Sequence, residues 1–427
     1  MHYHIDRKIN YSLATITEPD LAIVSAIISV DLHDSNSVTK QTMELMYPEA
    51  LLSGAGTFKR AEFLDAVNTL GASIDVGIGD GMLAISVRST AQVFNKVLRL
   101  VEILLLEPMF PKSELKRIRD TVVNELHEHK ENSKALALEA LRNEFYGAAD
   151  RKYSYDIASS TKAVDGVTMS ALKTWHDVIL NRNWTCSLAG SDDAAKAFEK
   201  MIAKCKKGRE VIVLAGAHEQ KVVKKKVSLA NIPSRQNIDF SIGAPIPFTL
   251  HHPDYVPLAF ALTVLGKWGG FTGRLMSTVR EKEGLTYGIY AGLEGFTGSE
   301  QGYWRIMTFF APDKTMQGLT STFREVSNIY KHGITEEEFD KFKNILSTGQ
   351  TLLQDSIMSL LRDLHSYHVH GFTLEEMAEH KNKINTVTLR EVNAAAKTYL
   401  NPANLVVSGA GPINAVKKDI EKFVKGV

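Results

Sequence analysis

The order of the elements predicted along the chain repeats once, and this repeat restricts the fold more than any other feature. In each half, the apolar periodicities predict a strand, two helices, a pair of strands, a long helix, a longer helix and a closing strand. A tandem repeat of one unit is the simplest architecture with this order. We therefore expect an α+β protein with two tandem homologous domains, each an antiparallel-rich sheet covered by helices.

The boundary between the two halves is predicted from a lysine-rich segment with little apolar periodicity, which ends near Lys226. A charge run of this kind is more typical of a solvated connector than of a phosphate site. We expect an N-terminal domain at residues 1–215, a linker at 216–235 and a C-terminal domain at 236–427.

Two long helices and one hairpin are predicted from local signals within the halves. Pro111 and Ser113 open a helix that is predicted to continue to Asn143, and a second long helix is predicted from Thr335 to Tyr367. The dipeptide Asp80-Gly81 predicts a tight hairpin between two strands.

The composition excludes several classes of function. The chain has 427 residues with Lys+Arg 50 and Asp+Glu 49, so its net charge of +1 argues against nucleic acid as the main partner. Its two cysteines have no paired spacing and no histidine partner, which argues against a disulfide framework and against a thiol protease. The apolar runs are too short to span a membrane, and no signal peptide is expected at the N-terminus. These features predict a soluble protein of the bacterial cytoplasm or periplasm.

Residues 265–287 hold the most informative local pattern. A glycine cluster is followed by a short amphipathic helix, by a predicted helix stop at Gly284 and by a predicted strand at 285–293. The glycines of the cluster are Gly266, Gly269, Gly270 and Gly273. The helix is expected to turn Leu275, Met276 and Val279 inward and Arg274, Arg280 and Lys282 outward. This order places a cation, Arg280, near a helix end and a phenol, Tyr287, at the start of a strand, so that both are able to face one cavity.

This stretch resembles the insulinase-like (pitrilysin-type) zinc metallopeptidase family, in its mitochondrial-processing-peptidase-like branch. Residues 280–287 match the family signature Arg-Glu-Lys-x-Gly-Leu-x-Tyr, and the preceding glycines match its glycine-rich turn. Shorter segments that resemble the family occur in the expected order at 56–60, 106–110, 183–190 and 333–344. The resemblance covers nearly the whole chain and implies that the chain forms half of a clam-shell chamber.

The zinc motif of the family is missing. Active members carry His-x-x-Glu-His just before a Gly-Thr pair, and the resemblance places Tyr47, Ala50 and Leu51 at the motif positions. A slip of one residue would bring Glu49 to the position of the base, but no histidine to either ligand position. Glu125 stands where the distal glutamate ligand is expected, and a catalytic zinc needs three protein ligands. None of the fourteen histidines belongs to such a motif, so we expect no metal in this chain.

The second pair of family residues is present. By resemblance, Arg280 and Tyr287 correspond to the arginine and tyrosine that reach across the chamber toward substrate carbonyls and the developing oxyanion. Both side chains are hydrogen-bond donors suited to that task. From the residues alone, a surface arginine and a tyrosine at the edge of a strand remain open as alternatives. Gly269 and Gly270 are expected to face the substrate.

The histidine pairs and the glycine cluster do not predict a metal or phosphate site. His127 and His129 point about 200° apart on a helix and cannot bind one ion together. His365 and His368 share a helical face, but their spacing brings no carboxylate ligand to them. The glycine cluster lacks the Gly-Lys-Ser/Thr pattern of a phosphate loop.

The sequence thus predicts the zinc-less subunit of a heterodimeric peptidase that acts on short unfolded peptides. Its partner would be a homologous subunit with His-x-x-Glu-His and the zinc, and the chamber would bind peptides largely by strand addition to a sheet edge. One alternative is a purely structural or peptide-binding subunit, like the core subunits of this fold in respiratory complexes. The other is a peptidase that is active alone through ligands of another pattern.

Overall fold

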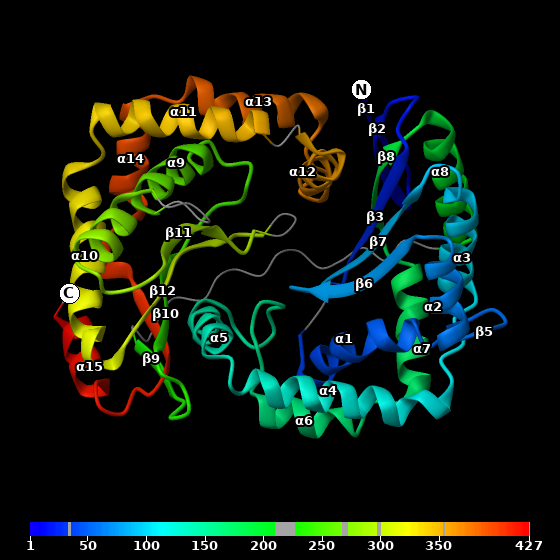
Figure 1. Cartoon of the computed structure of the whole chain (residues 1–427), viewed down its shortest axis with the longest axis horizontal. Helices are drawn as coiled ribbons and strands as arrows, with labels where there is room; N and C mark the ends of the chain where they lie inside the picture. Colours follow the sequence, from blue (N-terminus) through cyan, green and yellow to red (C-terminus); the bar gives the residue numbers. More distant parts are fainter. Residues whose placement is uncertain (33–35, 210–226, 267–271, 297–299, 353–354, 427) are drawn as a thin grey trace. The chain divides into compact units, whose positions relative to one another are not determined.

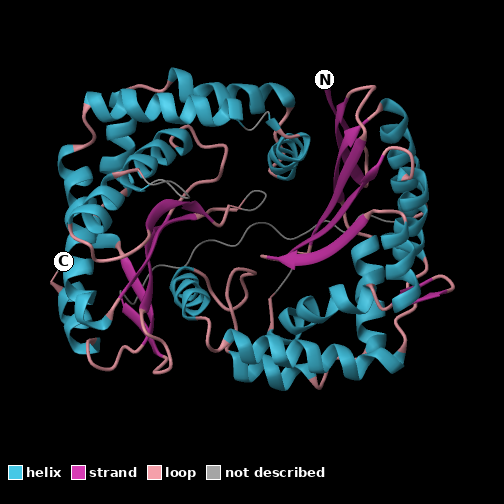
Figure 2. Cartoon of the chain, in the orientation of Figure 1, coloured by secondary structure: helices cyan, strands magenta, loops and turns pink. Residues whose placement is uncertain are grey.

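The computed structural model describes residues 1–32, 36–209, 227–266, 272–296, 300–352 and 355–426, and its elements are labelled in Figure 1. The chain forms two compact units. The first comprises Met1–Leu126, Tyr155–Gly216 and Leu353–Met377, and the second comprises His127–Ser154, Ala217–Leu352 and Ala378–Val427. Each unit has one large sheet with helices packed against it, as the colouring of Figure 2 shows, so the predicted α+β class is confirmed.

Within the described residues, the large sheet of the first unit has six strands in the order β1-β2-β8-β3-β7-β6. Only β2 and β8 are parallel neighbours. The strands are β1 (His2–Arg7), β2 (Tyr11–Thr17), β3 (Ile23–Asp31), β6 (Ser73–Gly79), β7 (Met82–Thr90) and β8 (Trp184–Gly190), and a separate small hairpin is formed by β4 (Gly54–Ala55) and β5 (Phe58–Lys59).

Helices cover the apolar face of this sheet. Val24, Ile28 and Val30 of the central strand β3 are buried there in one continuous core with the helices that follow. The helices of the first unit are α1 (Val38–Leu51), α2 (Arg60–Thr69), α3 (Phe94–Leu106), α4 (Leu115–His129), α6 (Ile157–Val164), α7 (Met169–Leu180), α8 (Asp192–Lys206) and α12 (Ile357–Val369).

The predicted hairpin at Asp80-Gly81 is confirmed. Both residues have positive φ, 49° and 69°, and they join β6 to β7. These angles are the ones that a two-residue type I′ turn requires, and Asp-Gly adopts them at low cost.

In the described part of the second unit, the sheet has five strands in the order β11-β12-β10-β13-β9, and only β13 and β9 are parallel there. Ile238, Phe240 and Ile242 of β10 are buried in its core. The strands are β9 (Val227–Asn231), β10 (Ile238–Pro245), β11 (Ile289–Glu294), β12 (Tyr303–Phe310) and β13 (Val406–Gly411). The helices are α5 (Ser133–Phe145), α9 (Tyr255–Gly266), α10 (Thr315–His332), α11 (Glu336–Leu352), α13 (Leu374–Thr386), α14 (Leu389–Tyr399), α15 (Lys417–Lys425) and the π-helix η2 (Met276–Lys282).

Both predicted long helices are interrupted, and this corrects the sequence analysis. The helix expected from Pro111 to Asn143 ends at His129, and α5 begins after Asn132, whose side chain accepts a hydrogen bond from the Ala135 amide. The helix expected from Thr335 to Tyr367 ends at Leu352, and α12 begins at Ile357. Apolar periodicity continues through both breaks because each new helix also has an apolar face.

The interruptions let the two halves of the chain exchange helices. α5 comes from the N-terminal half but packs on β10 and β13 in the second unit, whereas α12 comes from the C-terminal half but packs on β3 and β8 in the first. The compact units therefore differ from the two halves of the chain. The predicted domain boundaries concern the halves, and they stay a prediction.

Two buried histidines fasten α12 to the first sheet. The His365 ring bonds the Ser29 hydroxyl through Nε2 (2.7 Å) and the Ser187 hydroxyl through Nδ1 (2.9 Å), and His368 Nδ1 lies 3.4 Å from Ser187 Oγ. Burial lowers the pKa of His365 to about 3 and that of His368 to about 4. The two histidines that share a helical face thus serve the packing of a helix.

A buried ion cluster lies beside α5 in the second unit. Glu300 pairs with Arg151 (2.7 Å) and Lys152 (3.0 Å), and the Lys152 ammonium also donates to the Gln301 carbonyl (2.9 Å). Burial acts to raise the pKa of Glu300, but the two cations outweigh it and lower that pKa. The segment that follows α5 is therefore held to the loop before β12.

We predict that acid weakens the fold through the α12 histidines. In the unfolded chain they gain protons near pH 6.5, whereas in the folded chain they stay neutral to about pH 4, so stability is lost as pH falls below 6.5. Two such groups lower the free energy of unfolding by about 2 to 3 kcal/mol between pH 7.5 and 5.5. Urea unfolding at both pH values measures this drop. The double variant His365→Gln/His368→Gln should show a drop smaller by that amount, and an unchanged drop would contradict the assignment.

Candidate peptide-facing site

The stretch that carries the family signature folds as a turn, a helix and a bend. Residues 267–271, with Gly269 and Gly270, lie outside the described residues. The expected short helix is present as the π-helix η2, and Leu275, Met276 and Val279 are fully buried as predicted. Gly284 follows with φ +63°, so the predicted stop at this glycine is confirmed. π-Helical turns are rare and occur frequently at functional sites.

The glycines on either side of the undescribed residues allow a close backbone contact. A Cβ added at Gly273, whose φ is +114°, would lie 2.9 Å from the Gly266 Cα atom. No side chain fits in this space, so position 273 requires glycine if the start of η2 is to pack on the end of α9.

Arg274 was expected to point outward, and this prediction is wrong. Its guanidinium forms a two-pronged pair with the Glu338 carboxylate, with both distances 2.7 Å, and it donates to the Gly333 carbonyl at 3.0 Å. Two parallel hydrogen bonds from one guanidinium to one carboxylate are stronger than a single contact between the two groups. Arg274 therefore ties the start of η2 to the start of α11.

Tyr287 lies on a bend before β11, which begins at Ile289 and not at Leu285 as predicted. The Gly288 carbonyl accepts hydrogen bonds from the hydroxyls of Thr286 and Thr308, both at 3.1 Å. Both threonines are buried, whereas the Tyr287 side chain is 84% exposed. The two hydroxyls thus fix a bend that projects the phenol away from the core, and within the described chain this phenol has no hydrogen-bond partner.

Arg280 lies in the same helix that leads to this bend. Its side chain is half-buried, and its carbonyl accepts the Gly284 amide at 3.0 Å, which closes the helix. The structure therefore fixes the backbone of Arg280 and of Tyr287 on the two sides of the Gly284 turn, with a cation on one side and an exposed phenol on the other.

The positions of the zinc motif lie in the apolar core of the first unit. Tyr47, Ala50 and Leu51 are fully buried. The Tyr47 hydroxyl lies 2.7 Å from His176 Nδ1, and His176 Nε2 lies 2.8 Å from the Leu105 carbonyl oxygen. Because a carbonyl only accepts, Nε2 carries the proton and Nδ1 accepts the Tyr47 hydroxyl. Burial raises the pKa of Tyr47 and lowers that of His176, so both stay neutral.

The nearby carboxylates do not complete a metal site. Glu49 pairs with Arg117 at 2.8 Å and with Arg60 at 3.5 Å, and Glu125 is exposed on α4. Across the part of the chain that the structure describes, no three His, Cys, Asp or Glu side chains are grouped to hold a metal ion. The residues at the motif positions therefore do not fit zinc. His176, which takes the Tyr47 hydrogen bond, was not singled out from the sequence, where it appears only as one histidine in a helix.

Comparison with known proteins agrees with the motifs. Residues 167–346 match the family model described as "Peptidase M16 inactive domain". A Mycobacterium tuberculosis protein described as an uncharacterized zinc protease is 28% identical over 139 residues, which are 33% of this chain and 31% of that protein. The match thus spans about a third of the length of this relative. The Helicobacter pylori protein described as non-peptidase homolog YmxG is 20% identical over 83% of this chain and 81% of its own length.

Solved structures extend the likeness to the whole fold. A Pseudomonas fluorescens peptidase M16 inactive domain superposes with a TM-score of 0.84 at 21% identity and covers 96% of this chain and 98% of its own. A chain of complex III2 from Candida albicans gives 0.72 at 14% identity, with 97% of both chains covered. The match of residues 167–346 to the M16 inactive-domain model confirms the resemblance to insulinase-like peptidases that was drawn from the sequence, and the positions of the zinc motif hold no histidine.

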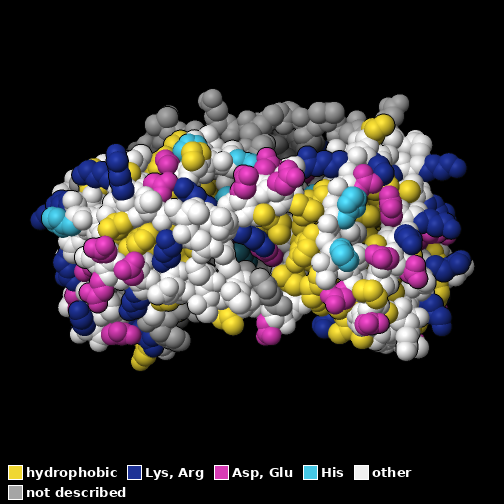
Figure 3. Space-filling view, turned by 90° about the horizontal axis from the view of Figure 1, so that it is seen from above, with side chains coloured by type: hydrophobic (Ala, Val, Ile, Leu, Met, Phe, Trp, Pro, Cys, Tyr) yellow, Lys and Arg dark blue, Asp and Glu magenta, His cyan; other side chains and the backbone are white. Residues whose placement is uncertain are grey.

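The surface adds two observations. Acidic and basic side chains are interspersed on the face that Figure 3 displays, in keeping with the net charge of +1. Among the described helices, none is both long enough and apolar enough to cross a membrane.

We predict that Tyr47→Phe destabilises the protein by about 1 to 3 kcal/mol, because it leaves His176 Nδ1 buried without a donor. Urea unfolding at pH 7.5 measures the change. Tyr287→Phe is the matched control, since its hydroxyl is exposed, and it should change stability by less than about 0.5 kcal/mol. Equal effects of the two variants would show that the Tyr47 hydrogen bond does not hold this core.

Proposed function

We propose that this chain is the zinc-less subunit of a heterodimeric M16 peptidase that degrades or processes short unfolded peptides. The observation that carries the proposal is the contrast between two sets of positions. Those of the zinc motif are buried in a packed core, whereas Tyr287 is 84% exposed on a bend that two buried threonine hydroxyls fix. The bend presents the Tyr287 hydroxyl to groups outside the chain, which supports its use by a substrate.

In this proposal Arg280 and Tyr287 supply hydrogen-bond donors to the substrate. Guanidinium and phenol groups stabilise negative charge that develops on a carbonyl oxygen, and fixed donors do so with little reorganisation. The partner would be a homologous subunit with His-x-x-Glu-His, which would hold zinc and polarise the scissile carbonyl. Peptidase activity would then depend on assembly of the two chains, because the partner would hold the zinc and this chain would hold the Arg280 and Tyr287 donors.

A second candidate is a structural or peptide-binding subunit without a catalytic role. The description of the Helicobacter pylori relative as a non-peptidase homolog and the likeness to a chain of complex III2 favour it. Arg280 and Tyr287 would then be dispensable, which the first experiment below decides. Stoichiometric zinc on the isolated chain would instead support a peptidase that is active alone.

We predict that adding this chain raises the activity of a zinc-bearing M16 partner, such as one encoded by an adjacent gene, on a fluorogenic peptide. Tyr287→Phe or Arg280→Gln should lower kcat of the mixture by about 10²- to 10³-fold, the usual effect of removing one oxyanion donor. Arg390, an exposed arginine of the same unit, provides the control Arg390→Gln, which should act as the unchanged chain. Full activity with both site variants would contradict a catalytic role.

We also predict a positioning role for Thr308. Thr308→Val removes one hydroxyl that bonds the Gly288 carbonyl, so the Tyr287 bend loosens and kcat of the mixture falls about tenfold. Thr308→Ser retains the hydroxyl and should restore the rate. A merely structural role would give Val and Ser variants with equal kcat once each is folded, as judged by circular dichroism.

A further inference from the structure

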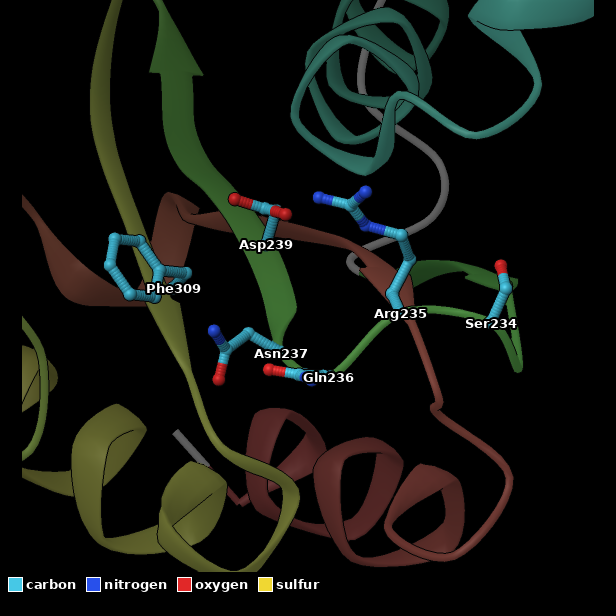
Figure 4. A pocket seen from close by; sticks show the side chains of 6 residues that line it. All are labelled: Ser234, Arg235, Gln236, Asn237, Asp239 and Phe309. Carbon is cyan, nitrogen blue, oxygen red and sulfur yellow. The ribbon is translucent and has the colours of Figure 1, made fainter.

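A polar pocket of about 490 Å³ opens on the second unit, at the start of β10. It is lined by Ser234, Arg235, Gln236, Asn237, Asp239 and Phe309. Figure 4 shows the Arg235 guanidinium and the Asp239 carboxylate pointing toward one another, with the Phe309 ring on the other side of Asp239. A turn supplies the first residues of the pocket and two paired strands supply Asp239 and Phe309.

The pocket lies on the sheet face that is turned away from the helical core. Asp239 pairs with Phe309 in the β10–β12 register, and their neighbours Phe240 and Phe310 are buried in the core. Because side chains alternate along a strand, Asp239 and Phe309 lie on the opposite face. This face carries α5, whose first residue, Ser133, bonds Asp239 Oδ2 at 2.5 Å.

The same end of the sheet carries the Tyr287 bend. Ile289, the first residue of β11, pairs with Thr308, and Thr308 also holds the Gly288 carbonyl. Phe309, the next residue of β12, belongs to the pocket. One end of β12 thus supplies both Thr308, which holds the Tyr287 bend, and Phe309, which lines the pocket.

Most polar groups of the pocket are available to a ligand, whereas the Ser234 hydroxyl donates to the Glu131 carboxylate. Among the described residues, the side chains of Arg235, Gln236 and Asn237 make no hydrogen bond or ion pair, and Asp239 bonds the Ser133 hydroxyl through one oxygen. The set therefore offers one cation and two amides, one carboxylate oxygen, and an aromatic ring.

We infer that this pocket binds the C-terminal residue of a peptide, an assignment that rests on the proposed function only in taking peptides as the ligands. The free carboxylate would pair with Arg235, whose planar fork suits it, and the amide N–H of the same residue would donate to Asp239. An apolar last side chain would cover Phe309. The Asn237 and Gln236 amides complete the donors around the carboxylate.

The presence of Asp239 separates this ligand from other anions. A phosphate group has no donor for a carboxylate and would be repelled by it. An acidic side chain inside a peptide also lacks an N–H at the short, fixed distance from its carboxylate that a C-terminal residue provides. A free C-terminus offers a carboxylate to Arg235 and, from the same residue, a neutral N–H donor to Asp239.

The test measures binding to the isolated chain by fluorescence anisotropy. The probe is an N-terminally labelled hexapeptide that ends in leucine, as the free acid and as the C-terminal amide. A third peptide has an amidated end and an internal glutamate. We expect the free acid to bind at least about tenfold more tightly than either amidated peptide. Arg235→Gln should abolish this difference, while Arg390→Gln should retain it.

Any of four outcomes overturns the assignment. Three are equal binding of acid and amide, an unchanged preference in Arg235→Gln, and no binding of any peptide at millimolar concentration. Tight binding of the internal glutamate peptide would assign the pocket to acidic side chains and also overturn it. Because no partner chain is present, failure here leaves activation of a zinc-bearing partner untouched. Conversely, if the free acid binds more tightly than the amide but the chain does not activate a zinc-bearing partner, only the proposed function is refuted.

Discussion

Each large sheet of this protein depends on a helix that the other half of the chain supplies. On the first sheet, α12 covers the face of β3 and β8 that carries Ser29 and Ser187, and buried hydroxyls of this kind need partners. The His365 ring provides a partner for both. On the second sheet, α5 covers β10 and its Ser133 hydroxyl bonds Asp239. Neither half of the chain could satisfy these groups alone, so the exchange couples the folding of the two halves.

The residues at the positions of the zinc motif remove the metal ligands and also form part of the packed apolar core. A metal-binding histidine must keep a nitrogen open to the ion, and a catalytic site must admit water. Tyr47 does neither, because its hydroxyl is used by His176 and its ring packs against Trp175 at 5.3 Å. A return to histidine at positions 47 and 51 would place two imidazoles in an apolar core, so the present packing opposes reversal.

Much of the fold could be predicted from the sequence because it is encoded locally. The Asp80-Gly81 hairpin and the Gly284 stop depend on backbone angles that few residues adopt, so their residues identify them. The breaks before α5 and α12 were missed, since an apolar helical face does not reveal which sheet it will cover. Arg274 was misplaced for a similar reason, because its partner Glu338 is distant in the sequence.

The candidate site, too, could be predicted only in part from the sequence. The family signature indicated Arg280 and Tyr287, but it gives no reason for the exposure of the phenol. That reason lies in Thr286 and Thr308, on separate strands, whose hydroxyls meet at one carbonyl. The residue after Thr308 is Phe309, so the strand that fixes the bend also lines the polar pocket. A shift of β12 would therefore move both the Tyr287 bend and the Phe309 side of the pocket.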